Sequence, residues 1–156
     1  MQSVKSNTEE RELIFSRLLD APIKLVWKVW TNPDHLALWW GPDGFTNTIK
    51  KMDLKPGGEW NLIMHGPDGT DYNIRCVFRE IVPEKKITYE QFTNFKCIAT
   101  IRFESRGDKT FIHWHMLFES KEYLIQTAKA FGVVTGLQQN AERLVHYLSQ
   151  FVDNQF

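Results

Sequence analysis

Two histidines that flank a tryptophan, in the run His113-Trp114-His115, are the side chains in this sequence best spaced to bind a metal ion. Alternate residues of a β-strand point to the same face, so both imidazoles would lie on one side of a sheet. The hairpin register derived below places the cation of Arg102 opposite His113 and offers only Glu104 as a nearby carboxylate, which disfavours a metal. We therefore predict surface histidines, no metal site and no other cofactor.

Acid–base chemistry has one candidate group, in which His65, Asp68 and Asp71 surround a Gly-Pro-Asp-Gly turn. A β-hairpin loop is sufficient to explain this composition, because Asp and Gly are favoured in tight turns for their backbone geometry. No spacing in the sequence assigns a Ser/His/Asp or a Cys/His group for nucleophilic catalysis. Catalytic residues therefore stay unassigned.

Two adjacent tryptophans, Trp39 and Trp40, stand directly before a Gly-Pro-Asp-Gly turn. With Leu36 they have the i, i+3, i+4 spacing of one face of a short helix, which is typical of core packing. The two indoles lie about 100° apart around the helix axis. Trp40 could therefore also form a cavity wall that meets Trp60 and Trp114 from a sheet, and the two interpretations are compatible.

The elements that position these side chains follow from periodicity and turn signals. Residues 12–20 are rich in strand formers, and Pro22 and Pro33 each begin a short helix, the first with Asp20 close enough to cap it. Six further strand candidates are separated by short Gly-, Pro-, Asn- or Asp-containing breaks. They span residues 45–54, 58–65, 70–82, 86–92, 96–105 and 109–120.

Connections this short join antiparallel neighbours, so the six strands are predicted to form a meander. Apolar residues at steps of three and four then predict a helix at about 121–130 and a long one at about 133–151. The expected fold class is α+β: a curved antiparallel seven-stranded sheet wrapped around a long C-terminal helix, with two short helices after the first strand. Residues 11–152 would form this single domain, preceded by a disordered polar tail at residues 1–10.

Register can be predicted for two hairpins. If a loop of residues 106–109 joins the last two strands, paired residue numbers sum to 215 and one face is apolar, with the pairs Phe103–Ile112, Ile101–Trp114 and Ala99–Met116. The other face carries both histidines and is mixed polar, as expected for a sheet with helices on one side only. In the hairpin of residues 58–82, the alternating apolar residues share a face if the loop has three or five residues.

Composition limits the classes of partner. With 19 basic and 19 acidic residues the formal charge is zero, which disfavours a general nucleic-acid binder. No apolar run has the length of a membrane span, and the polar first residues do not resemble a secretory signal. We predict that Cys76 and Cys97 are free thiols, because a third strand would lie between them, and we expect a cytoplasmic protein that is a monomer or weak homodimer.

The sequence also resembles a known family. The matching elements span residues 11–150 and are Arg17, Asp20-Ala21-Pro22, Val26-Trp27, Trp30-Thr31, Pro33, Trp39-Trp40-Gly41, Pro56-Gly57-Gly58 and the terminal run FGVVTGLQQNAERLVHYL. Together they resemble the START-like (SRPBCC) superfamily of polyketide cyclase/dehydrase and lipid-transport proteins. Within it, the chain is most similar to bacterial homologues of the heat-shock protein 90 ATPase activator. The resemblance implies a helix-grip fold with a cavity between the sheet and the terminal helix, but no single reaction.

Alternation and helical spacing predict which side chains line that cavity. They are Trp40, Trp60, Met64, Tyr72, Ile74, Ile101, Trp114, Met116, Phe131 and Val134. The expected function is the binding of a small, mostly apolar molecule there, coupled to stress or to regulation. One alternative is an enzyme of the cyclase or hydrolase kind that uses Tyr72, Arg17 and Gln91 as polar groups in the same cavity, and another is a chaperone-associated interaction domain.

Overall fold

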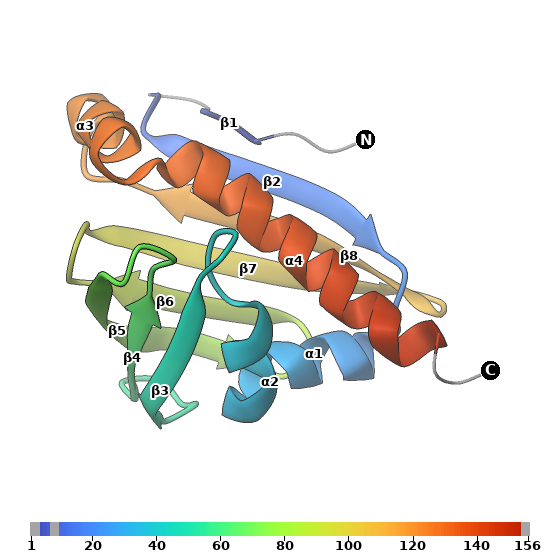
Figure 1. The fold of residues 1–156 in the computed structure, drawn as a ribbon. Helices are drawn as coiled ribbons and strands as arrows, with labels where there is room; N and C mark the ends of the chain where they lie inside the picture. The colour runs from blue at the N-terminus through green and yellow to red at the C-terminus, as the bar shows by residue number, and fades with distance from the viewer. Residues whose placement is uncertain (1–3, 7–9, 154–156) are drawn as a thin grey trace.

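One curved antiparallel sheet holds a long C-terminal helix against one of its faces (Figure 1). The structure is a computed structural model that describes residues 4–6 and 10–153. Its strands are β1 (Val4–Ser6), β2 (Glu12–Leu19), β3 (Thr46–Met52), β4 (Glu59–His65), β5 (Asp71–Val82), β6 (Lys86–Gln91), β7 (Cys97–Arg106) and β8 (Lys109–Leu117). Its helices are α1 (Ile23–Thr31), α2 (Pro33–Trp39), α3 (Lys121–Phe131) and α4 (Val133–Asp153).

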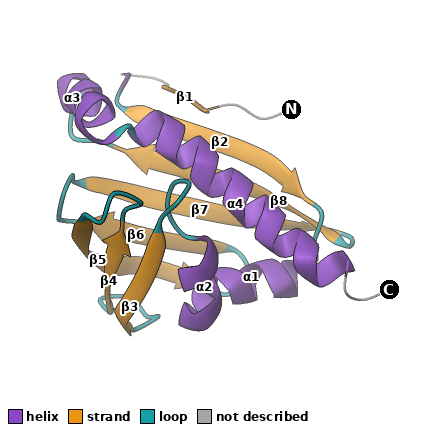
Figure 2. Ribbon diagram, in the orientation of Figure 1, coloured by secondary structure: helices purple, strands orange, loops and turns teal. Residues whose placement is uncertain are grey.

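The strand order is β1-β2-β8-β7-β6-β5-β4-β3, so the predicted meander is continuous and β2 joins it beside β8. This confirms the predicted helix-grip fold, in which the two short helices lie at one end of α4 and α3 lies at the other (Figure 2). The short strand β1 is an addition, because it pairs with Leu13–Phe15 along the outer edge of β2. It differs from the disorder predicted for residues 1–10, of which residues 1–3 and 7–9 lie outside the described residues.

Both register predictions are confirmed. In the β7–β8 hairpin, Ile101 pairs with Trp114 and Ala99 with Met116, as the sum of 215 requires. In the β4–β5 hairpin, His65 pairs with Asp71, which leaves a loop of five residues. Buried and less buried residues alternate along β8, so its apolar side chains face the helices and its histidines face away.

The residues at the ends of the helices explain where α2 begins and where α3 ends, but the predicted cap of α1 is not formed. The predicted cap by Asp20 is wrong, because Pro22 occupies the N-cap of α1 without a side-chain hydrogen bond and the Asp20 carboxylate accepts from Lys109 Nζ at 2.9 Å instead. At the start of α2 the Asn32 side chain accepts from the backbone N–H of the second residue, as a favoured N-cap does. Gly132 ends α3 with a φ of 62°, a left-handed conformation that suits glycine.

The adjacent residues Trp39 and Trp40 have different environments, one in the core and one at the cavity. Trp39 is fully buried and donates from Nε1 to the carbonyl oxygen of Val29 at 3.0 Å. Trp30 packs edge-on between Trp39 and Trp114, with ring centroids 4.9 Å from each. Such aromatic contacts add to the burial of apolar area. Trp39 is therefore a core residue, and Trp40 is left to face the cavity described below.

The two cysteines lie on either side of β6, since Cys76 and Cys97 each pair with Gln91. Both are free and buried, as predicted. Burial raises the pKa of both thiols, that of Cys97 to about 12. Because the thiolate is the nucleophile, we expect Ellman's reagent to label neither cysteine in the native protein and both after unfolding without reductant. Rapid labelling of the folded protein, or fewer than two thiols in the unfolded protein, would contradict this packing.

Candidate functional site

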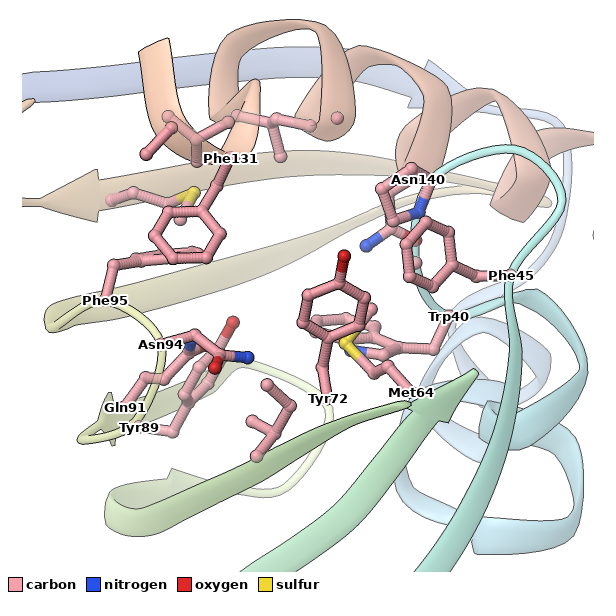
Figure 3. Close-up of a pocket in the computed structure, with 18 of the residues that line it drawn as sticks. Trp40, Phe45, Met64, Tyr72, Tyr89, Gln91, Asn94, Phe95, Phe131 and Asn140 are labelled. Atoms are coloured by element: carbon pink, nitrogen blue, oxygen red, sulfur yellow. The ribbon is translucent and has the colours of Figure 1, made fainter. Parts of the chain in front are cut away.

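A partly open cavity of about 230 Å³ lies between the concave face of the sheet and the helices α3 and α4 (Figure 3). The sheet contributes Met64, Tyr72, Ile74, Tyr89, Gln91, Trp114 and Met116 to its lining. The helices contribute Ala130, Phe131, Val133, Gly136, Leu137 and Asn140. The connecting segments contribute Trp40, Gly41, Pro42, Phe45, Asn94 and Phe95.

Most of the residues predicted for the cavity line it, namely Trp40, Met64, Tyr72, Ile74, Trp114, Met116 and Phe131. Three do not. Trp60 lies one layer behind, with its ring centroid 5.1 Å from that of Trp40. Ile101 is completely covered by protein atoms. Val134 is replaced in the lining by Val133, because α4 begins directly after Gly132 and this sets which side of its first turn faces the cavity.

Trp40 forms one wall of the cavity. Its indole stacks on that of Trp114 at an interplanar angle of 22° and a centroid distance of 5.8 Å. The chain then turns at Gly41, whose φ is 98°, and a Cβ atom added there would lie 2.9 Å from Cε of Met64. The positive φ favours glycine at this position, and a side chain there would also have to displace the flexible end of Met64. The Trp-Gly pair thus brings an aromatic wall close to the sheet.

Arg143 of α4 holds this wall in place. Its Nη1 donates to the carbonyl oxygens of Trp40, Gly41 and Pro42 at 2.9, 3.0 and 2.9 Å. Burial lowers the pKa of this guanidinium from its ordinary value, while Asp43 favours the charged form. A cation near the last carbonyls of a helix is favourable, and these carbonyls follow the end of α2.

Besides the two tryptophans, five side chains with uncharged polar groups line the cavity: Tyr72, Tyr89, Gln91, Asn94 and Asn140. In the view of Figure 3, the Tyr72 hydroxyl and the amide end of Asn140 point into the space between Phe131 and Phe45. Within the described residues, the side chains of the partly buried Tyr72 and the buried Tyr89 make no hydrogen bond, and Asn140 Oδ1 is buried without a partner. Unpartnered buried polar groups are costly, so water or a ligand must satisfy them.

The polar groups predicted for an enzyme are only partly brought together. Tyr72 and Gln91 line the cavity, but Arg17 forms an ion pair with Glu142 of α4 at 2.5 Å and does not. Burial raises the pKa of Tyr89 well above its ordinary value of 10, so its hydroxyl keeps its proton at neutral pH. None of the lining side chains carries a charge at pH 7.

The two histidines of β8 lie on the opposite face of the sheet. His113 Nδ1 lies 2.8 Å from the Ser16 hydroxyl, and His115 Nε2 lies within hydrogen-bond distance of a carboxylate oxygen of Glu12. Burial is the main cause that lowers the pKa of His113 from its ordinary value. Electrostatic interactions with His115 and Arg102 lower it further. Across residues 4–6 and 10–153, no three His, Cys, Asp or Glu side chains gather as a metal site would require.

His65, Asp68 and Asp71 belong to the hairpin that joins β4 and β5, and their contacts stabilise its loop. His65 Nδ1 lies 2.7 Å from a carboxylate oxygen of Asp71, the residue with which it pairs across β4 and β5. Asp68 accepts a backbone hydrogen bond from Thr70 at 3.0 Å inside the loop, which lowers the pKa of its carboxyl group. All three acid–base candidates lie outside the cavity lining.

An antiparallel sheet that curves around a long C-terminal helix over a cavity defines the START-like, helix-grip class of proteins. The chain belongs to the family described as Activator of Hsp90 ATPase homolog 1-like protein, whose model matches residues 20–149. No curated protein matches the sequence at a significant level. None of the helices in the described part of the chain is both long and apolar enough to cross a membrane.

Solved structures agree with this assignment. A protein from Arthrobacter aurescens has 25% sequence identity and a TM-score of 0.87, over 95% of this chain and 91% of its own. A protein from Nitrosomonas europaea has 23% identity and a TM-score of 0.81, over 92% of this chain and 97% of its own. CalU16 from Micromonospora echinospora shares the fold at 17% identity and a TM-score of 0.63, over 99% of this chain and 87% of its own.

Proposed function

We propose that this protein binds a small, uncharged, mostly apolar molecule in the cavity between its sheet and α4. The observation that carries the proposal is a 230 Å³ space walled by Trp40, Trp114, Phe45 and Phe131, with a few neutral polar groups among them. Concave, mainly aromatic pockets with a few polar groups are typical small-molecule sites. A cavity of about 150 Å³ in another protein holds benzene, so this one has room for two fused rings, and its open side admits a third ring.

The free-energy cost of leaving the cavity empty supports the proposal that a ligand occupies it. At ~24 cal/mol per Å³, a dry and empty space of 230 Å³ would destabilise the fold by about 5 to 6 kcal/mol. That is comparable with the whole stability of a small domain, which is about 5 to 15 kcal/mol. Water on the five polar side chains offsets part of this cost, and an apolar ligand that covers Trp40 and Trp114 would offset more.

Binding fits the lining better than catalysis does. General acid–base catalysis needs a positioned group whose pKa is near the working pH and which can reach the substrate. The lining has no carboxylate, imidazole, amine or thiol, and the Tyr89 hydroxyl holds its proton too tightly to act as a base. A cyclase or hydrolase activity would have to depend on neutral hydroxyl and amide groups alone.

The state of the cysteines and the family bear on the biological setting. The two free, buried thiols are compatible with a reducing compartment, and we place this function in the cytoplasm. The family description names an activator of a chaperone ATPase, which agrees with a role in stress or regulation. We propose that the bound molecule is the signal for that role, and that contact with a chaperone is secondary to it.

Narrowing the cavity tests the proposal. Ile74 of β5 is 7% exposed and points into the cavity, so Ile74→Trp should occupy part of it without removing a structural hydrogen bond. We expect the affinity for N-phenyl-1-naphthylamine, an uncharged fluorescent probe, to fall at least about tenfold. That loss corresponds to 1.4 kcal/mol of binding free energy. Fluorescence titration of wild-type and variant proteins measures it.

Two matched controls localise the effect. Asn73→Trp adds the same ring to the exposed side of the same strand, and His113→Ala combined with His115→Ala alters the outer face of the sheet. Both proteins should bind the probe as the wild type does, with melting temperatures close to that of Ile74→Trp. Loss of binding in the histidine variant, with full binding in Ile74→Trp, would move the site to the outer face and contradict the proposal.

A further inference from the structure

Two polar side chains on β6 lie next to each other on the cavity side of the sheet. Tyr89 and Gln91 are two residues apart, so they share a face, and both line the cavity. They are 3% and 8% exposed, which makes them two of the most deeply buried polar groups of the lining. In Figure 3 they lie together near Asn94, on the side of the cavity away from Phe45.

The orientation of the Gln91 amide is set by a neighbour. Its Nε2 donates to the backbone carbonyl oxygen of Thr93 at 3.1 Å, a bond that only the nitrogen can make. The Oε1 atom is therefore presented elsewhere, and no described residue donates a hydrogen bond to it. Gln91 thus offers the cavity a fixed, unused acceptor.

Tyr89 offers both a donor and an acceptor. Its ring packs edge-on against Trp60 at a centroid distance of 5.0 Å and against Trp40 at 6.4 Å, which fixes the position of the hydroxyl. No described residue makes a hydrogen bond to that hydroxyl. Since burial keeps it protonated, it can donate to a ligand oxygen at any pH near neutrality.

The proposed ligand site can therefore be assigned a more specific chemistry. We infer that Tyr89 and Gln91 bind a hydroxyl group of an uncharged apolar ligand, such as a phenol or an alcohol; this inference rests on the proposed function. The ligand hydroxyl accepts a hydrogen bond from the Tyr89 hydroxyl and donates one to Gln91 Oε1. A hydroxyl is the smallest group that satisfies both partners at once.

Charged ligands do not fit the same place. A carboxylate has no proton for Gln91 Oε1, and its full negative charge would face the partial negative charge of that amide oxygen. The lining holds no cation to compensate, because Arg143 is committed to three carbonyl oxygens behind the Trp40 wall. A ligand amine would be buried without a carboxylate, which is equally unfavourable.

Equilibrium dialysis at pH 7 with naphthalene, 2-naphthol and 2-naphthoate separates these chemistries. Wild-type protein should bind 2-naphthol more tightly than naphthalene, and 2-naphthoate most weakly. Tyr89→Phe removes only a hydroxyl, so the ratio of naphthol to naphthalene affinity should fall about fivefold, as expected for one neutral hydrogen bond. Naphthalene binding itself should be unchanged. Tyr147→Phe, which removes a hydroxyl that contacts His35 outside the cavity lining, should keep the wild-type ratio.

The possible outcomes distinguish a failure of the hydroxyl site from a failure of the proposed ligand binding in the cavity. If neither naphthalene nor 2-naphthol binds, the proposed function fails and the hydroxyl site fails with it. If naphthalene binds but the affinity ratio is unchanged in Tyr89→Phe, only the hydroxyl site is overturned. A ratio that falls as much in Tyr147→Phe as in Tyr89→Phe, or a preference for 2-naphthoate, overturns it as well.

Discussion

Leu148→Asp is expected to leave the protein unfolded at 25 °C. Leu148 is 3% exposed on the apolar stripe of α4, together with Leu137, Ala141 and Leu144. The substitution removes buried apolar area and buries a carboxylate without a cation, each at a cost of several kcal/mol. Because small domains have only about 5 to 15 kcal/mol of stability, the sum is enough to unfold the chain. Circular dichroism should show no cooperative thermal transition.

Gln150→Asp is the matched control, two residues further along the same helix. Gln150 is exposed, so the new carboxylate stays in water and the free energy of unfolding should change by about 0.5 kcal/mol or less. Similar melting temperatures for Leu148→Asp and Gln150→Asp would mean that α4 presents a different face to the sheet.

Arg143→Met should give the second largest loss. It keeps the apolar stem of the side chain but removes the hydrogen bonds to the carbonyl oxygens of Trp40, Gly41 and Pro42. Asn47 and Phe45 still donate to the first and the last of these, whereas the Gly41 oxygen has no other donor among the described residues. Hydrogen bonds from a charged group contribute about 1.5 to 3 kcal/mol each, and partial exposure of the guanidinium reduces the total. We expect about 2 to 4 kcal/mol of destabilisation in denaturant titrations, together with weaker binding of N-phenyl-1-naphthylamine because the Trp40 wall is released.

Arg102→Met removes the same type of side chain from the exposed face of β7 and should leave both stability and binding nearly unchanged. If Arg143→Met were as stable as this control, the three hydrogen bonds would not anchor the wall. If it lost stability but bound the probe normally, the wall would not depend on Arg143 for its position.

Features set by periodicity could be predicted from the sequence. Strict alternation along residues 97–106 and 109–117 determined which side chains share the buried face, and the register followed from the loop length. Helical spacing likewise predicted that the indoles of Trp39 and Trp40 lie about 100° apart, so that Trp40 could face the cavity while Trp39 packs in the core. These predictions succeed because a one-residue shift would move a whole set of apolar side chains into water.

Features that depend on contacts between distant segments could not be predicted. Phe45 and Phe95 reach the cavity from connecting segments without periodicity, and Arg143 reaches a turn about a hundred residues earlier. Tyr89 and Asn140 did carry a signal. Tyr89 alternates with the buried Ile87, and Asn140 is a polar residue on the apolar stripe of α4. A polar residue on such a face predicts either a buried partner or a cavity.

Tryptophan side-chain NMR tests the central claim most directly. Each of the six tryptophans has an indole N–H resonance, but only Trp40 and Trp114 line the cavity. On addition of N-phenyl-1-naphthylamine, these two resonances should shift most, while that of Trp27, which packs against Phe103 at 5.4 Å, should not move. Shifts confined to the backbone amides of His113 and His115, with Trp40 and Trp114 unchanged, would contradict ligand binding in the cavity.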